Sequence, residues 1–291
     1  MNSPEPGPLV AAEWLAAHLD DPDLVLVHVG LDRRIYDVAH LPGAIFVDMH
    51  VDLARLGTRP ETGEVKRHYL VPTREEVSAS LATWGVAPGQ RIVFYDDAGQ
   101  NRQAIRGYWL LRLYGFPRER LHVLDGGLAF WQNERRPTTA EAFEPEPMVA
   151  TEPLQERDGS LIATADEVLA WSREASAKGG PTRLLDVRMI DEFLGTDVRA
   201  ARGGHVPGAE NRLFSDFIAP DGRLRTGPQA LAILRGTGVE PDELRATYCQ
   251  GGVRAALVWF VLHELAGLDG VRSYAGSWEE WGSRPELPIE K

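Results

Sequence analysis

The chain has 291 residues, of which 43% are hydrophobic and 25% are charged, as in an average soluble globular protein. This length allows two ordinary domains of about 100–200 residues each. A formal net charge of −12 argues against nucleic-acid or anionic-membrane binding as the main task. The single cysteine, Cys249, cannot form an internal disulfide, and the N-terminus lacks a basic segment followed by an apolar one. We therefore expect a cytoplasmic protein.

Short apolar strands alternate with helical patterns along the chain. The predicted strands are 24–29, 91–96, 121–124, 183–188, 244–249 and 271–274. Thr73 with Glu76, and Thr164 with Glu167, form capping boxes that open two of the predicted helices. Two further helices are predicted over 102–114 and 253–266, each followed by a glycine. This alternation predicts an α/β fold with small parallel sheets covered by helices on both faces.

Several segments recur in the same order, which indicates an internal duplication. The recurring pairs are Gly85-Val-Ala-Pro88 with Gly238-Val-Glu-Pro241, His40-Leu-Pro-Gly-Ala44 with His205-Val-Pro-Gly-Ala209, and Gly126–Trp131 with Gly276–Trp281. A repeat this long indicates a duplicated domain rather than a solenoid. We predict two tandem domains over 1–140 and 160–291. The segment 141–159, which is rich in proline and glutamate, is the predicted linker.

Cys249 ends a predicted strand, and a helix is predicted to begin at about Val253. In parallel sheets, ligands bind at the carboxyl ends of the strands. Gly251 and Gly252 permit a tight turn without side chains that block approach. The N–H groups of such a turn, the helix dipole and Arg254 stabilise a thiolate over a thiol. The alternative is a buried cysteine that acts as a small hydrophobic residue.

The spacing between Cys249 and Arg254 separates two enzyme classes that use such a thiolate. Cysteine-dependent phosphatases need five intervening residues to surround a tetrahedral phosphate. Here four intervene, Gln250, Gly251, Gly252 and Val253, and the smaller ring suits a sulfur atom. A cysteine-dependent phosphatase or arsenate reductase stays open as an alternative, as does a non-catalytic sulfur-binding or regulatory module.

The chain resembles the tandem-domain rhodaneses, sulfurtransferases of the thiosulfate and 3-mercaptopyruvate group. The segments that carry the resemblance are Leu185-Asp-Val-Arg188, Gly204-His-Val-Pro-Gly-Ala209, Cys249-Gln-Gly-Gly-Val-Arg-Ala255 and Tyr274-Ala-Gly-Ser-Trp-Glu-Glu-Trp281. The resemblance implies two rhodanese-like domains, of which only the second is catalytic. In the first copy Asp96 takes the place of Cys249, and His28 and Gly30 take those of Asp186 and Arg188.

The resemblance also implies the reaction and the roles of the site residues. A sulfane sulfur passes from thiosulfate to cyanide or a thiol through a persulfide on Cys249, and the N–H groups of residues 250–254 hold its charge. Arg188 is predicted to bind the anionic group of the donor, with an ion pair to Glu192 as the alternative. Arg254 is predicted either to face the substrate or to brace the turn, and Asp186 to support the turn or Arg188.

The alternative donor is 3-mercaptopyruvate. In relatives that use it, a histidine resembling His68 forms a proton relay with a loop serine and an aspartate, whose positions here hold Gly251 and His50. This incomplete relay favours thiosulfate. His40 and His205 lie in matching Gly/Pro turns and are predicted to be structural. No cofactor or metal is expected, since no ligand spacing occurs. The expected partners are small donors and acceptors, or a thiol protein such as thioredoxin, and the expected state is a monomer.

Overall fold

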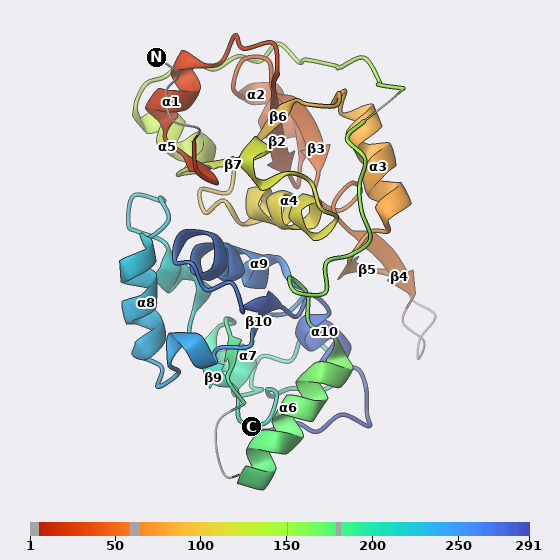
Figure 1. The fold of residues 1–291 in the computed structure, drawn as a ribbon, viewed down its shortest axis with the longest axis vertical. Helices are drawn as coiled ribbons and strands as arrows, with labels where there is room; N and C mark the ends of the chain where they lie inside the picture. Colours follow the sequence, from red (N-terminus) through yellow and green to blue (C-terminus); the bar gives the residue numbers. More distant parts are fainter. Residues whose placement is uncertain (1–5, 59–64, 150, 179–181) are drawn as a thin grey trace. The chain divides into compact units, whose positions relative to one another are not determined.

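The computed structural model describes residues 6–58, 65–149, 151–178 and 182–291 (Figure 1). The α-helices are α1 Ala12–Ala17, α2 Arg33–Val38, α3 Arg74–Thr83, α4 Arg102–Leu113, α5 Gly127–Asn133, α6 Ala165–Lys178, α7 Ile190–Phe193, α8 Gly227–Arg235, α9 Val253–Trp259 and α10 Ser277–Trp281. The strands are β1 Leu9–Val10, β2 Leu24–Gly30, β3 Ile45–Asp48, β4 Arg55–Thr58, β5 Val65–Leu70, β6 Arg91–Asp96, β7 Leu121–Leu124, β8 Leu184–Asp186, β9 Glu210–Asn211, β10 Ala246–Tyr248 and β11 Arg272–Ser273.

The chain divides into two compact units. One comprises Met1–Arg55, Val71–Asp158 and Ala219–Leu224, and the other comprises Leu56–Leu70, Gly159–Ile218 and Arg225–Lys291. The first contains a five-stranded sheet in the order β1-β7-β6-β2-β3, and the second a four-stranded sheet in the order β11-β10-β8-β9. All pairs in both sheets are parallel, which confirms the predicted α/β class. Strands β4 and β5 form a separate two-stranded sheet.

In the first unit, alternating residues of β6 serve the two faces of the sheet. Val93 and Tyr95 belong to a buried cluster that also contains residues of α1 and α5. Phe94 points the other way, toward α4, where a methyl group added at Gly107 would lie 2.9 Å from its ring. Because side chains alternate along a strand, the apolar run over 91–96 buries both faces of the sheet.

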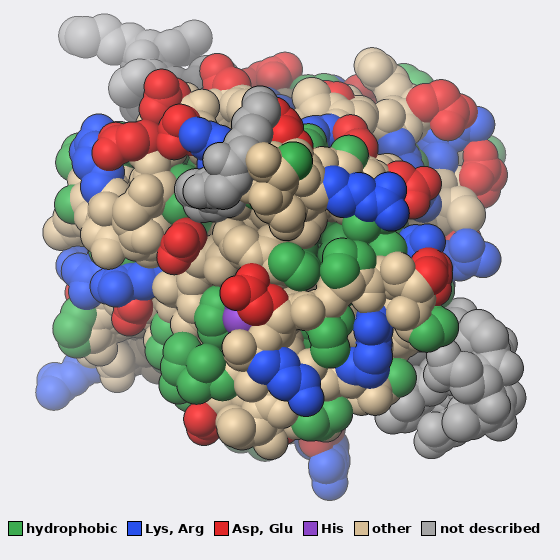
Figure 2. All heavy atoms as spheres, turned by 90° about the horizontal axis from the view of Figure 1, so that it is seen from below, with side chains coloured by type: hydrophobic (Ala, Val, Ile, Leu, Met, Phe, Trp, Pro, Cys, Tyr) green, Lys and Arg blue, Asp and Glu red, His purple; other side chains and the backbone are tan. Residues whose placement is uncertain are grey.

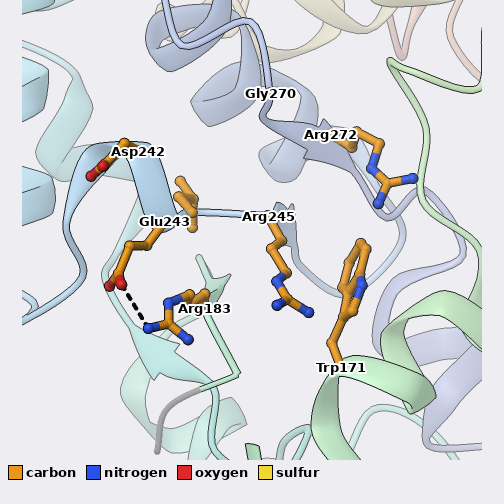
Figure 3. Close-up of a pocket in the computed structure, with 8 residues that line it drawn as sticks. Trp171, Arg183, Asp242, Glu243, Arg245, Gly270 and Arg272 are labelled. Atoms are coloured by element: carbon orange, nitrogen blue, oxygen red, sulfur yellow. Dashed lines mark hydrogen bonds and ion pairs between the residues drawn. The ribbon is translucent and has the colours of Figure 1, made fainter. Parts of the chain in front are cut away.

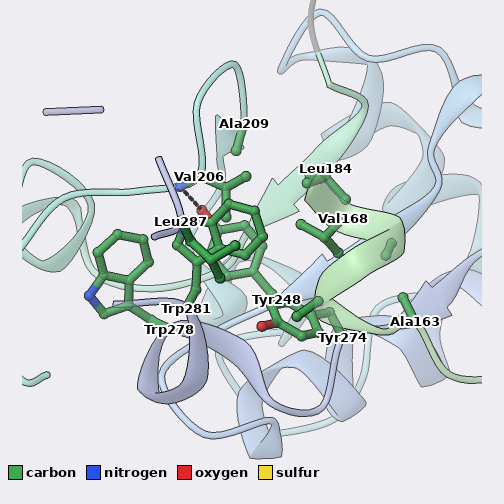
Figure 4. Close-up of a cluster of buried hydrophobic side chains, with 12 residues drawn as sticks. Ala163, Val168, Leu184, Val206, Ala209, Tyr248, Tyr274, Trp278, Trp281 and Leu287 are labelled. Atoms are coloured by element: carbon green, nitrogen blue, oxygen red, sulfur yellow. Dashed lines mark hydrogen bonds between the residues drawn. The ribbon is translucent and has the colours of Figure 1, made fainter. Parts of the chain in front are cut away.

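In the second unit, one face of the sheet packs against α6 and α10 (Figure 4). Ala246 and Tyr248 of β10 contribute to this core together with Trp278 and Trp281 of α10. Thr247 points to the opposite face, where its hydroxyl donates to the carbonyl of Ala255 in α9 at 3.0 Å. The two tryptophans are 1% and 0% exposed, so they are buried in this core.

Most predicted elements form where the sequence placed them, but one helix differs. Both capping boxes are present, with the N–H of Thr73 donating to Glu76 at 2.7 Å and that of Thr164 donating to Glu167 at 2.9 Å. The predicted helix over 253–266 was wrong in its second half, since the chain turns into a π-helix over Phe260–Leu265. Apolar periodicity does not distinguish the two because a π turn adds a single residue.

The strand registers of the two sheets support the duplication. His28 pairs with Tyr95, and Asp186 pairs with Tyr248. The hydroxyl of each tyrosine accepts a backbone N–H from the recurring His-Leu/Val-Pro-Gly segment, at 3.0 Å from Leu41 and at 3.2 Å from Val206. The residues after these tyrosines, Asp96 and Cys249, therefore occupy equivalent positions.

Acidic and basic side chains are interspersed on the face shown in Figure 2. Among the coloured residues, this pattern differs from the basic stripe typical of nucleic-acid-binding surfaces. None of the helices in the described part of the chain is long and apolar enough to span a membrane.

Candidate functional site

Cys249 directly follows β10 at the carboxyl edge of the second sheet. Side chains alternate along a strand, so Cys249 continues the α9-facing row that includes Thr247. The cysteine is free and only 1% exposed. The strand-end position predicted from the sequence is confirmed.

Gly252 joins the cysteine to α9. It has a φ of +87° and is the residue that precedes the first turn of α9. Its backbone N–H donates to the Cys249 sulfur at 3.1 Å. A Cβ atom at this position would lie 2.7 Å from the carbonyl oxygen of Ala275. Glycine is therefore required both for the left-handed backbone and for the space beside Ala275.

Ser277, the first residue of α10, holds the backbone of the cysteine. Its hydroxyl accepts the N–H of Cys249 at 3.1 Å and donates to the carbonyl of Tyr274 at 2.8 Å. Ser277 has a φ of +53°, and its counterpart Gly127 in the first copy has a φ of +56°. A non-glycine residue in this region costs about 1–3 kcal/mol. Ser277 therefore adopts a backbone conformation that favours glycine, and its hydroxyl accepts the N–H of Cys249 there.

Two further amides of α10 fix the orientation of the turn. The N–H of Trp278 donates to the carbonyl of Cys249, and that of Glu279 donates to the carbonyl of Gln250, both at 2.9 Å. In a trans peptide the N–H points opposite to the preceding carbonyl. The N–H groups of Gln250 and Gly251 therefore point away from α10. This contact between α10 and the turn was not predicted from the sequence.

Arg254 makes a two-point ion pair with Glu192 of α7. Its two terminal nitrogens lie 2.7 and 2.8 Å from the carboxylate oxygens, and the two side chains are 13% and 0% exposed. Burial opposes ionisation of Glu192, but the hydrogen bond and charge of Arg254 outweigh it and lower the pKa of this carboxyl. Burial likewise opposes the charge on Arg254, while the hydrogen bond and charge of Glu192 raise its pKa. Of the two predicted roles, this geometry favours bracing of the turn.

The side chain of Arg188 makes buried contacts within the second unit. It is 1% exposed, and its Nε and Nη2 atoms bind the two carboxylate oxygens of Asp186 at 2.9 and 2.6 Å. Nη2 also donates to the carbonyl of Gly204 at 2.7 Å, and the guanidinium lies 4.7 Å from the ring centroid of Trp278. These contacts engage Nε and Nη2 within the protein, and the predicted binding of the donor by Arg188 stays a prediction. Asp186 supports Arg188, in line with one of its two predicted roles.

The other predicted turn residues flank Gly252 in the sequence. Gln250 donates through its amide nitrogen to the carboxylate of Glu279 at 2.9 Å and to the carbonyl of Arg199 at 3.2 Å. Val253 is the first residue of α9. Of the amides expected to stabilise the sulfur, that of Gly252 is the one seen in contact with it. The participation of the others stays a prediction.

The first copy carries a carboxylate at the equivalent position. Asp96 is fully buried and accepts backbone N–H groups of Asn101, Gln103 and Ala104 at 3.2, 3.0 and 3.4 Å. Burial raises the pKa of Asp96 to about 6 despite these hydrogen bonds. The amides at the start of α4 thus bind an acidic side chain of the protein itself.

His40 and His205, which were predicted to be structural, each pack against an aromatic ring. His40 stacks on Tyr36 with ring centroids 3.7 Å apart, and His205 stacks on Phe193 at 3.6 Å. Their Nδ1 atoms lie 2.7 and 2.9 Å from the carbonyl oxygens of those same aromatic residues. The side chain of His68 lies outside the described residues. No cluster of three metal-binding side chains occurs among the residues that the structure describes.

Comparison with known proteins places this geometry in a family. The rhodanese-like domain matches the chain twice, over residues 11–134 and 164–284. The chain belongs to the rhodanese family. It is 35% identical to the thiosulfate sulfurtransferase of Corynebacterium glutamicum, over 98% of this chain and 91% of that protein. It is 34% identical to a putative thiosulfate sulfurtransferase of Haloferax volcanii, over 97% and 96% of the two chains.

The rhodanese fold is also seen in a solved structure. SseA of Escherichia coli, described with the catalytic mechanism of 3-mercaptopyruvate sulfotransferases, aligns with a TM-score of 0.74 and 25% identity. The alignment covers 94% of this chain and 99% of SseA. The tandem architecture inferred from the repeats is therefore that of this rhodanese relative.

Proposed function

We propose that this rhodanese transfers a sulfane sulfur from thiosulfate to a thiophilic acceptor through Cys249. The thiolate attacks the outer sulfur of thiosulfate, a new S–S bond forms, and the original S–S bond breaks as sulfite leaves with the electron pair. Cyanide or a thiolate then attacks the terminal sulfur of the persulfide. That bond forms as the persulfide S–S bond breaks, and the Cys249 thiolate is regenerated.

The observation that carries this proposal is the contact between the Gly252 amide and the Cys249 sulfur, 3.1 Å. A backbone donor at a helix N-terminus stabilises negative charge on the sulfur without a metal. The remaining amides of the turn, from Gln250 to Arg254, are proposed to add donors once a second sulfur is attached. These preorganised dipoles need no rearrangement during the reaction.

The supporting residues act through the turn. The pair between Arg254 and Glu192 fixes the first turn of α9 and supplies a positive charge near the sulfur. The pair between Arg188 and Asp186 is buried beneath the strand ends and holds the loop that follows β8. We therefore assign both pairs positioning roles.

The donor preference is part of the proposal. Thiosulfate is favoured because sulfite leaves as an anion and needs no proton relay, and Gly251 stands where relatives that use 3-mercaptopyruvate carry a relay serine. We further propose a monomeric cytoplasmic enzyme, with 160–291 as the catalytic domain, 1–140 as the non-catalytic domain and 141–159 as the linker. The acceptor is a small thiophile or a thiol protein such as thioredoxin.

Steady-state kinetics test the proposal. With thiosulfate and cyanide varied together, double-reciprocal plots should be parallel, and thiocyanate should be released. Replacing thiosulfate by 3-mercaptopyruvate should lower kcat/KM. A higher kcat/KM with 3-mercaptopyruvate would reverse the donor assignment, and phosphate release from an aryl phosphate without thiocyanate formation would favour a cysteine phosphatase.

A further inference from the structure

Three arginines lie at the amino ends of neighbouring strands in the second unit. Arg183 and Arg245 immediately precede β8 and β10, and Arg272 is the first residue of β11. The N–H of Arg245 donates to the carbonyl of Arg183 at 2.9 Å, and that of Arg272 donates to the carbonyl of Arg245 at 3.0 Å. Since neighbouring strands lie about 4.8 Å apart, the backbone brings three cationic side chains to one edge of the sheet.

These arginines line a pocket with a volume of about 420 Å³. This volume lies within the range of small-molecule sites, about 300–1,000 Å³. Figure 3 shows the three guanidinium groups around the pocket, with Trp171 of α6 beside them and the carboxylate of Asp242 directed away. The guanidinium carbons of Arg272 and Arg245 lie 4.7 and 5.5 Å from the Trp171 ring centroid. The tryptophan thus orients two of the three cations.

Each arginine has a carboxylate partner at the protein surface. The ion pairs are Arg183 with Glu243 at 2.6 Å, Arg245 with Glu174 at 3.1 Å and Arg272 with Glu167 at 2.7 Å. The three glutamate side chains are 40%, 42% and 41% exposed. Ion pairs this exposed contribute little to stability. Each of these pairs engages one terminal nitrogen of a guanidinium that carries several further donors.

We propose that this pocket binds a compact multivalent anion that carries two or more phosphate or carboxylate groups. Arg183 and Arg245 share one anionic group by displacing their exposed glutamate partners, and Arg272 binds a second one beside Trp171. A planar guanidinium can bind a phosphate or carboxylate group through two parallel hydrogen bonds. Two such hydrogen bonds bind more strongly than the contact that each arginine makes with one oxygen of its glutamate partner.

The proposed site is separate from the Cys249 turn. Arg245 precedes β10 at its amino end, whereas Cys249 follows the carboxyl end of the same strand. Four residues of extended chain span about 13 Å. The proposed anion site and the Cys249 turn therefore lie at opposite edges of the same sheet.

Isothermal titration of the full chain with pyrophosphate, and separately with citrate, tests the proposal at constant ionic strength set with chloride. Arg245→Gln and Arg183→Gln should each raise Kd by about tenfold or more, the loss expected for charge-assisted hydrogen bonds. Arg235→Gln is the matched control. Arg235 forms an exposed ion pair with Glu240, with 3.9 Å between the two charged groups, and neither residue lines the pocket. For this variant Kd should stay within about twofold of the wild-type value. Cys249→Ser should bind like the wild type.

The two probes separate the ligand classes, since tighter pyrophosphate binding indicates a phosphorylated ligand and tighter citrate binding a polycarboxylate. Thermal unfolding verifies that each variant is folded. Arg183→Gln keeps the test valid if Arg245→Gln fails to fold, because the Arg183 side chain is 34% exposed. Absence of binding by the wild type, or equal weakening by Arg235→Gln, overturns the proposal and leaves a purely structural ion-pair cluster.

Discussion

Gly252→Ala tests how strictly the turn depends on its backbone. Gly252 has a φ of +87°, and an added Cβ would lie 2.7 Å from the carbonyl oxygen of Ala275. The left-handed conformation alone costs an alanine about 1–2 kcal/mol. Relief of the overlap with a backbone oxygen adds about 1–3 kcal/mol, the usual range for overpacking. The two terms predict a loss of about 2–5 kcal/mol in unfolding free energy.

Gly238→Ala is a matched control. Gly238 has a φ of +86° and no neighbouring atom within 4 Å of an added Cβ, so this variant carries the conformational cost without the overlap. Urea unfolding should therefore show a larger loss for Gly252→Ala than for Gly238→Ala. Because relief of the overlap moves the Gly252 amide away from the Cys249 sulfur, kcat/KM with thiosulfate should fall by about 100-fold. Equal stability losses together with an unchanged kcat/KM would refute the reasoning.

Three further variants change buried charged residues, and a fourth, in an exposed ion pair, is a control. Burial raises the pKa of Asp96 from 3.8 to about 6, so the folded state favours the neutral carboxyl. The free energy of unfolding should therefore fall by up to about 3 kcal/mol as pH rises through this interval. Asp96→Asn should remove this pH dependence, and a pH dependence that persists in the variant would contradict the assignment to Asp96. Glu192→Gln leaves the buried charge of Arg254 without its carboxylate partner and should lower the free energy of unfolding by about 3–5 kcal/mol. The control Asp216→Asn removes one partner of an exposed ion pair and should change this free energy little. Similar urea midpoints for the two variants would contradict a stabilising role of the pair between Arg254 and Glu192. Arg188→Lys should lower Tm while leaving KM for thiosulfate unchanged, and a raised KM at unchanged Tm would instead support the predicted role of Arg188 in donor binding.

The repeats and strand ends allowed much of the fold to be predicted. Apolar runs and capping boxes are local signals, so β2, β6, β7 and α3 could be found from neighbouring residues alone. The two-residue strand β9 and the four-residue helix α7 have no such signal, because tertiary contacts rather than local preference define them. The π-helix escaped prediction because Phe260, Val261, Leu262 and Leu265 continue the apolar pattern of the helix that precedes it.

In the site, the cysteine and the glycine turn were predictable because strand, glycine and helix start are adjacent in the sequence. The pairing of Asp186 with Arg188 also had a signal, since residues two apart in a strand point to the same side. The pair between Arg254 and Glu192 spans 62 positions, and no local pattern connects them. Ser277 was missed because the sequence does not indicate a serine in a left-handed conformation.

The most direct test of the account is the mass of the intact protein after incubation with thiosulfate and removal of the excess. We predict a gain of one sulfur atom, about 32 Da, on the peptide containing Cys249. Cyanide should reverse the gain with release of thiocyanate, and Cys249→Ser should show no gain. Thiocyanate formation without any sulfur adduct on the protein, or with full activity in Cys249→Ser, would contradict a persulfide carried by this residue.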